Sequence, residues 1–249
     1  MPKVYPNERL PMKKIGVIGT GKTGSAVAEA LGAQAILFNR SNPPAADALR
    51  GLAGAIVFVT PDAAEGVMQV LLEAGVPVAW GTTGFALPES LDRRVRDLET
   101  SWVTASNFSM GMILMKSLIE KAGELSHLLG DPEFVIRETH HVQKKDKPSG
   151  TALHWGAWLG HPVAIHSERK GDVIGSHSLT IRTGLESITV THEANDRALF
   201  AAGAIRALKW LLEYPNLRGV YDVHELASYV HEQGKRDMGR RSVTWAGES

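Results

Sequence analysis

Short apolar runs alternate with amphipathic segments through the first part of the chain. Apolar runs of four or five residues are typical of strands buried in a parallel sheet, and apolar residues three or four apart indicate helices. We expect strands at residues 14–18, 35–38, 55–59, 76–80 and 102–105. We expect helices at residues 25–31, 61–75 and 87–98. This alternation predicts an α/β domain with a Rossmann-like parallel sheet.

The pattern changes after a long apolar helix expected at residues 112–129. Strand-like segments follow at residues 134–138, 163–166, 177–182 and 187–192, with helices expected at 152–159 and 197–214. We therefore predict a second, α+β domain at about residues 110–217, with a mostly antiparallel or mixed sheet. Residues 1–109 and about 218–249 form the first domain, because residues 221–226 are expected to return to it. Residues 1–12 and the tail from Gly234 are expected to be disordered.

A glycine-rich loop follows the first expected strand and precedes the first expected helix. Gly19, Gly21 and Gly24 are spaced as GxGxxG, with Lys22 and Thr23 between the last two glycines. In this context the glycines allow a tight turn and let a pyrophosphate approach the helix N-terminus. The loop therefore predicts a dinucleotide site.

The same stretch has an alternative interpretation as an ATPase phosphate loop. Residues 16–23 read GVIGTGKT, which matches that motif. The motif requires its strand to end before Gly16, which would place Pro11 and two lysines in a central strand, where proline is disfavoured. We therefore keep the ATPase only as an alternative.

The end of the second expected strand bears on the choice of nicotinamide cofactor. An Asp or Glu usually holds a free ribose 2′-hydroxyl there, whereas Arg accommodates a 2′-phosphate. Arg40 stands at this place, and the first acid, Asp47, comes later. NADPH is therefore the favoured cofactor, with NADH possible.

Two polar clusters end the fourth and fifth expected strands, where ligands bind in open parallel sheets. The clusters are Gly81-Thr82-Thr83-Gly84 and Ser106-Asn107-Phe108-Ser109. They are candidate cofactor contacts, although ordinary turn chemistry also explains such residues.

A cationic stretch lies between the strand at 134–138 and the helix at 152–159. It contains His140, His141 and Lys144 and is followed by Pro148-Ser149-Gly150-Thr151. Ser149 is expected to cap the helix, which leaves the N–H groups of Gly150 and Thr151 at its positive end. Cations beside a helix N-terminus predict an anion site, and paired histidines add a proton donor that works near neutral pH. A solvated basic loop is the simpler alternative.

Composition excludes several classes of function. The 249 residues carry 27 basic and 27 acidic side chains, so no net charge favours nucleic acid. The chain has no cysteine, which excludes disulfides and thiolate chemistry. No apolar run reaches the length of a membrane span and no signal peptide is evident, so we expect a soluble, cytoplasmic protein.

The cationic stretch also resembles a known signature. It is similar to the ExHHxxKxDxPSGTA motif of dihydrodipicolinate reductases, which here consists of Glu138, His140, His141, Lys144, Asp146 and residues 148–152. The resemblance extends over about residues 15–226. It implies reduction of dihydrodipicolinate to tetrahydrodipicolinate on the route to lysine and diaminopimelate, by a homotetramer and without a metal.

The resemblance also implies roles for individual residues. His140 would be the general acid, with Lys144 as its partner or an activating cation. Substrate contacts are expected at His141, Lys144, Ser149, Gly150 and Thr151. Cofactor contacts are expected at Gly19, Gly21, Lys22, Thr23, Gly24, Arg40, Gly81, Thr82, Thr83, Ser106, Asn107 and Phe108. The chain departs from the family in its glycine loop, which is one residue shorter, and in lacking an acid after the second strand.

A third hypothesis is a non-catalytic NADPH-binding sensor whose cationic stretch binds a regulatory acid. Two separate anion sites, on two domains, predict a cleft that closes when both ligands are bound.

Overall fold

The computed structural model describes residues 13–244, with side chains described to residue 235. Its contacts divide the chain into two compact units, residues 1–108 with 200–249 and residues 109–199. The disorder expected for residues 1–12 and for the last five residues lies outside the described part. No helix among the described residues is long and apolar enough to cross a membrane.

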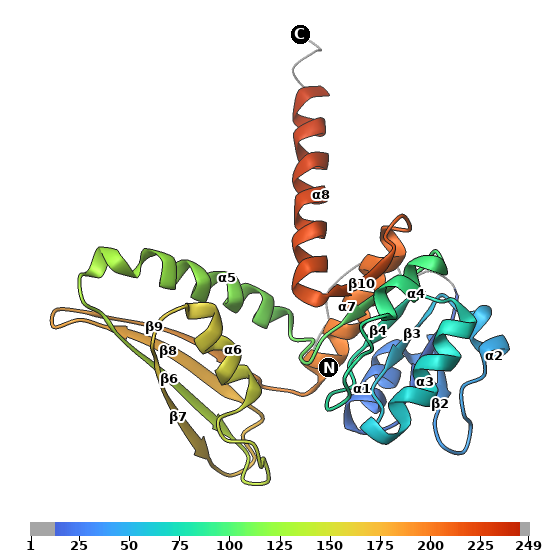
Figure 1. The fold of residues 1–249 in the computed structure, drawn as a ribbon, viewed down its shortest axis with the longest axis horizontal. Helices are drawn as coiled ribbons and strands as arrows, with labels where there is room; N and C mark the ends of the chain where they lie inside the picture. Colours follow the sequence, from blue (N-terminus) through green and yellow to red (C-terminus); the bar gives the residue numbers. More distant parts are fainter. Residues whose placement is uncertain (1–12, 245–249) are drawn as a thin grey trace. The chain divides into compact units, whose positions relative to one another are not determined.

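The first unit is built on a six-stranded sheet in the order β10-β5-β4-β3-β1-β2, in which every neighbouring pair is parallel (Figure 1). This confirms the predicted Rossmann-like fold. Its elements are β1 (Ile15–Ile18), α1 (Lys22–Leu31), η1 (Gly32–Gln34), β2 (Ala35–Phe38), α2 (Ala46–Arg50), β3 (Gly54–Val57), α3 (Pro61–Ala74), β4 (Val78–Trp80), α4 (Leu91–Asp97), β5 (Ser101–Thr104), α7 (Ala198–Glu213), β10 (Gly219–Asp222) and α8 (Val223–Thr244).

The strand order places β1 between β2 and β3. All four residues of β1 are buried, and Ile18 lies beside both Phe38 and Val57. The carboxyl ends of three strands therefore meet at Gly19, and this is the switch point at which ligands bind in such sheets. Gly16 lies inside β1, so the strand does not end before it as the ATPase interpretation requires.

Two C-terminal segments complete the first unit. In α7, Leu208 is fully buried, and its side chain lies within 2.9 Å of the position a Cβ would take at Gly54 in β3. Most of α7 consequently belongs with the first sheet, whereas the sequence-based boundary near residue 217 assigned it to the second domain. The tail from Gly234 was expected to be disordered, but it continues α8 to Thr244. The segment contains no proline, and its three arginines, Lys235 and Met238 favour a helix.

The second unit carries a four-stranded mixed sheet in the order β7-β6-β8-β9. Its elements are α5 (Met110–Leu125), η2 (Ser126–Leu129), β6 (Glu133–His140), α6 (Gly150–Leu159), β7 (Ala164–Arg169), β8 (Ser176–Arg182) and β9 (Ser187–Glu193). Strand β6 is parallel to β7 and antiparallel to β8. The predicted α+β fold with a mixed sheet is therefore confirmed.

Alternation along β6 creates a buried face that ends in polar residues. Phe134 and Ile136 pack with α5 and α6 in one apolar cluster. Glu138 and His140 follow at the same spacing of two, so they point to the same face and are buried as well. His177 pairs with Glu138 across the sheet and completes this end of the core. His140 thus lies within strand β6, whereas the sequence placed it in the segment after the strand.

Candidate functional site

The glycine loop is closely packed on one side and open on the other. Gly19 has a φ of 98°, and a Cβ there would lie 2.1 Å from the Phe58 carbonyl oxygen. A Cβ at Gly24 would lie 1.8 Å from the Gly19 carbonyl oxygen, whereas nothing lies within 4 Å of a Cβ at Gly21. The N-terminus of α1 has no side-chain capping hydrogen bond. Open backbone and an uncapped helix end fit the pyrophosphate of a dinucleotide.

The two glycines allow a matched test of this site. Gly24→Ala should lower the stability of the protein by about 3 kcal/mol, because its Cβ collides with backbone. Gly21→Ala has room for its Cβ, so the melting temperature should stay near that of the wild type while NADPH affinity falls. Thermal unfolding and cofactor titration of both variants check this. Unchanged NADPH affinity in a folded Gly21→Ala protein would contradict the assignment of the loop.

Three of the remaining cofactor candidates of the first unit, Gly81, Thr82 and Phe108, contact the segment after β3. A Cβ at Gly81 would lie 2.2 Å from the Phe58 ring, and the buried Phe108 ring packs edge-on against Phe58 at 6.1 Å. The buried Thr82 hydroxyl accepts a hydrogen bond from the Val59 N–H at 3.1 Å. Thr83 and Ser106 are exposed, Asn107 is half-buried, Lys22 is exposed at the start of α1, and Thr23 is half-buried. The two strand-end clusters thus come together, as expected for parallel strands.

Arg40 is exposed two residues beyond β2 and already has a partner. Its Nη2 lies 3.2 Å from the Asp62 carboxylate at the start of α3. Sequence reasoning looked for an acid after β2 and did not find Asp62, because the contact joins residues 22 positions apart.

The second candidate site surrounds the N-terminus of α6. Ser149 caps this helix as predicted, since its Oγ accepts a hydrogen bond from the Ala152 N–H at 3.2 Å. Gly150 and Thr151 are the first two residues of the helix. His141 directly follows β6 and is half-buried, and its carbonyl accepts a hydrogen bond from the Lys144 N–H at 3.1 Å.

A carboxylate of the chain itself, that of Asp146, lies at this site. We call the site, which consists of Lys144, Gly150 and Thr151, the α6 corner. The Lys144 ammonium group lies 2.8 Å from the Asp146 carboxylate. Hydrogen bonding to Lys144 is the main cause that lowers the pKa of Asp146, and the backbone N–H of Gly150 contributes as well. Lys144 thus binds a carboxylate a few residues before the start of α6.

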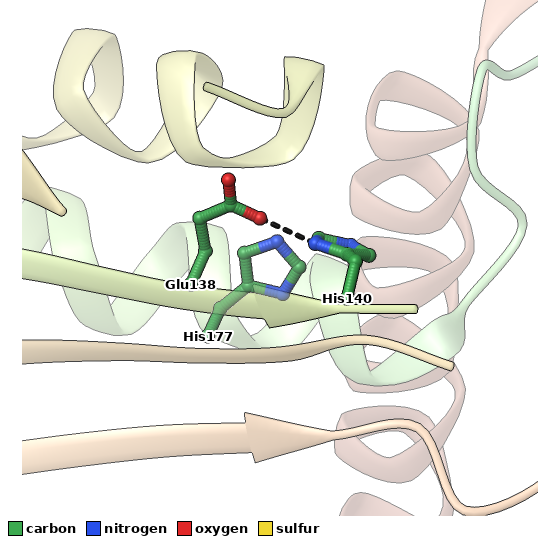
Figure 2. Close-up of side chains that lie close together, drawn as sticks. All are labelled: Glu138, His140 and His177. Atoms are coloured by element: carbon green, nitrogen blue, oxygen red, sulfur yellow. Dashed lines mark hydrogen bonds and ion pairs between the residues drawn. The ribbon is translucent and has the colours of Figure 1, made fainter. Parts of the chain in front are cut away.

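Buried hydrogen bonds orient the imidazole of His140. The Glu138 carboxylate bonds His140 Nδ1 through one oxygen (Figure 2). Its other oxygen lies 3.0 Å from Arg169 and accepts a hydrogen bond from the Ser149 N–H at 3.3 Å. With Nδ1 engaged, Nε2 is the atom left for a substrate. A Cβ at Gly175 would lie 3.1 Å from His140 Nε2, so the glycine leaves space beside this nitrogen.

His177 lies against the same pair. Its ring stands edge-on to the His140 ring at 5.0 Å, and its Nε2 lies 3.2 Å from the Ser149 hydroxyl. One nitrogen or oxygen atom from each of Glu138, His140 and His177 lies within 4.8 Å of the others. Histidine and carboxylate groups of this kind also occur as ligands in metal sites. The Arg169 guanidinium is already paired with the Glu138 carboxylate, so its positive charge disfavours a metal ion between these three side chains. The hydrogen bonds of the cluster are instead suited to fixing which ring nitrogen of His140 carries a proton.

The charges of this cluster follow from burial and pairing. Burial lowers the pKa of His140 below its ordinary 6.5, although Glu138 opposes the shift. Burial lowers the pKa of His177 to about 4, so this ring is neutral at neutral pH. Burial alone would raise the pKa of Glu138, but hydrogen bonds, that of Arg169 among them, outweigh it and keep the carboxylate ionised.

Known proteins match most of the chain. A 4-hydroxy-tetrahydrodipicolinate reductase from Haloarcula marismortui is 33% identical over 240 residues, which cover 81% of this chain and 94% of that protein. The enzyme of the same name from Halorhodospira halophila is 32% identical over 197 residues, 69% of this chain and 72% of that protein. The chain belongs to the 4-hydroxy-tetrahydrodipicolinate reductase family.

Two further findings agree with this membership. The family model described as "Dihydrodipicolinate reductase, C-terminus" matches residues 111–226. The structure of a dipicolinate-bound dihydrodipicolinate reductase from Paenisporosarcina aligns with a TM-score of 0.68 and 20% identity, covering 85% of this chain and 98% of the other. The reductase family consists of NAD(P)H-dependent oxidoreductases. Membership of this family confirms the resemblance that the 138–152 motif indicated.

Three residues of the site were not predicted from the sequence. Glu138 was part of the motif but had no role, and His177 and Arg169 were not singled out as members of the site. Arg169 also donates to the Lys144 carbonyl at 3.2 Å and to the Asp146 carbonyl, so it shapes the loop that carries Lys144. Arg169 and His177 lie within residues 15–226, over which the resemblance to the family extends, and that was the available signal.

Proposed function

We propose that this protein reduces 4-hydroxy-tetrahydrodipicolinate, or the dihydrodipicolinate derived from it, to tetrahydrodipicolinate in lysine and diaminopimelate biosynthesis. The observation that carries the proposal is the buried Glu138–His140 pair, which contacts the Ser149 cap of α6, together with the carboxylate that Lys144 binds just before that helix. A proton donor next to a carboxylate site suits a cyclic dicarboxylate that must take up a proton.

The proposed reaction needs a hydride donor and a proton donor. A nicotinamide, when bound, would supply a hydride to a carbon of the conjugated imine, and the electron pair of the imine would move to the ring nitrogen. His140 then donates a proton from Nε2 to the resulting enamine, because Glu138 engages Nδ1. Lys144 stabilises the negative charge that develops during transfer.

The substrate carboxylates would replace Asp146 at the α6 corner. Lys144 and the N–H groups of Gly150 and Thr151 would hold one carboxylate, with Ser149 fixing the helix end and His141 contributing from the loop. Asp146 supports this role because it is itself a carboxylate on Lys144. The cofactor would bind at the glycine loop, with Gly81, Thr82 and Phe108 near its nicotinamide and Arg40 near its 2′-phosphate.

Lys144→Ala tests the corner, with the exposed neighbour Lys145→Ala as its control. We expect Lys144→Ala to lower kcat/KM on the order of 10²-fold, because the charge both holds the carboxylate and stabilises the transition state. Competitive inhibition by pyridine-2,6-dicarboxylate should weaken, and NADPH affinity without substrate should not change. Steady-state kinetics and a cofactor titration measure this. If Lys144→Ala instead abolishes NADPH binding while the protein remains folded, the corner is a cofactor site.

The pH dependence follows from the lowered pKa of His140. A general acid works only when protonated, so kcat/KM should be constant at low pH and fall about tenfold per pH unit above the His140 pKa, which lies below 6.5. The bound dicarboxylate favours the imidazolium, so the fall in kcat should come at higher pH than the fall in kcat/KM. Rate profiles between about pH 5 and 8 measure both. A rise of kcat/KM with pH over this range would contradict the role of His140.

We also propose a homotetramer formed through the second sheet, in the cytoplasm. Helices α5 and α6 contribute to one cluster with the buried face of this sheet. The opposite face carries Arg137, Thr180 and Thr189, which are exposed or half-buried. Light scattering should give a mass about four times that of the chain, and a monomer would contradict the proposal.

The proposed activity is tested by adding substrate, generated in situ, to the protein and NADPH. Substrate-dependent loss of reduced nicotinamide is expected. ATP hydrolysis without such oxidation would favour an ATPase, and NADPH binding without turnover would favour a sensor.

A further inference from the structure

An ion pair joins the two chain segments that flank the glycine loop. Arg40 lies two residues after β2, and Asp62 is the second residue of α3, which follows β3. Because β2 and β3 pair with opposite edges of β1, the 3.2 Å contact between Arg40 Nη2 and Asp62 Oδ2 spans the switch point of the sheet. Backbone bonds from Gly19 to Phe38 and from Phe58 to Ile18 hold the same three segments together, at 2.9 Å each.

Asp62 is a charged acceptor at neutral pH. A hydrogen bond from the Thr60 side chain is the main cause that lowers its pKa, and Arg40 adds to the effect. An ionised carboxylate only accepts hydrogen bonds, which suits the two hydroxyls of a ribose and repels a phosphate. The acid that NADH-binding proteins carry at the end of β2 is thus available from α3.

A second acid of the same unit takes part in a different ion pair. Asp47, the first acid after β2 in the sequence, pairs with Arg50 inside α2. Asp62 instead pairs with Arg40, between the segments that follow β2 and β3. The Arg40–Asp62 pair is highly exposed, with 86% and 69% of the side chains accessible, and such pairs contribute little to stability.

We propose that Asp62 determines cofactor selectivity at the nucleotide site, an inference that rests on the proposed nicotinamide function. Asp62 holds Arg40 away from a 2′-phosphate and offers its carboxylate to a ribose 2′-hydroxyl. Arg40 alone would make the site selective for NADPH, and the pair makes it accept both cofactors.

Asp62→Asn should shift the two affinities in opposite directions. The change frees Arg40 and removes a repulsive charge, so the Kd for NADPH should fall about fivefold to tenfold at low ionic strength. The Kd for NADH should rise about threefold, because an amide is a weaker acceptor than a carboxylate. Fluorescence titration of the free protein with each cofactor measures this without turnover. Equal changes for NADPH and NADH, or none, would overturn the proposal.

A double-mutant cycle shows whether Asp62 acts through Arg40. Arg40→Ala should weaken NADPH binding more than NADH binding, and Asp62→Asn in the Arg40→Ala background should lose most of its gain for NADPH. Asp47→Asn removes the same charge from the same unit and should leave the ratio of the two Kd values unchanged. An equal gain with and without Arg40 would show that Asp62 acts only by its own charge, and would overturn the inference that it holds Arg40.

The same titration separates the inference from the proposed function. If wild-type protein binds neither cofactor, the nucleotide site itself is wrong. If it binds both cofactors and Asp62→Asn leaves their ratio unchanged, only the selectivity role of Asp62 fails. Added salt should reduce the difference between wild type and Asp62→Asn, because both side chains are exposed.

Discussion

His140→Gln should reduce turnover on the order of 10²- to 10⁴-fold while the KM for substrate changes little. Glutamine keeps much of the size of the imidazole but has no proton that it can transfer. Binding of pyridine-2,6-dicarboxylate should also be nearly unchanged, because the carboxylate corner at Lys144 and Gly150 remains. Steady-state kinetics and an inhibitor titration separate the chemical step from binding.

The control for this substitution is His166→Gln. His166 is exposed and pairs with Arg137, on the face of the sheet opposite to His140. The His166→Gln variant should retain full turnover. Turnover of His140→Gln within a few-fold of the wild type would remove His140 from the role of general acid.

Glu138→Gln should reduce kcat on the order of 10²-fold or more by changing the tautomer of His140. The amide oxygen would keep the contacts with Arg169 and the Ser149 N–H, so its NH₂ group would face Nδ1. Nδ1 would then have to accept a hydrogen bond, and its proton would move to Nε2. The pKa of His140 would also fall, because the carboxylate that favours the imidazolium is lost.

Nitrogen NMR of the histidine rings tests this positioning role without turnover. The wild type should show Nδ1 protonated in neutral His140, and Glu138→Gln should show Nε2 protonated. Glu133→Gln lies on the same strand, is exposed and should change neither spectrum nor rate. Glu138→Gln with a normal tautomer, pH profile and kcat would reduce Glu138 to a structural residue.

Periodicity predicted the architecture because burial determines it. The β1 run has every residue buried, and a continuous apolar run of this kind indicates an inner parallel strand. The five-residue helix α2 was missed, since a segment so short carries almost no helical period. The part of α8 from Gly234 onward was missed because a polar segment without an apolar stripe resembles disorder.

The site was predictable from the sequence only where its residues are close together in the chain. Ser149, Gly150 and Lys144 were found because a cap and its cations are adjacent in the sequence. The contacts Arg169–Glu138 and Asp62–Arg40 join residues 31 and 22 positions apart, and only the fold brings them together. The sequence likewise could not tell that Asp146 is the carboxylate on Lys144 rather than a solvated charge.

The central claim is that a hydride passes from bound NADPH to a dicarboxylate and that the chain supplies the proton. It is tested most directly by a reaction with NADPH that carries deuterium at the transferable position, followed by mass spectrometry of the product. We expect tetrahydrodipicolinate with one deuterium from the cofactor, formed at least about a hundredfold more slowly by His140→Gln. Absence of this product, or product without the label, would contradict it.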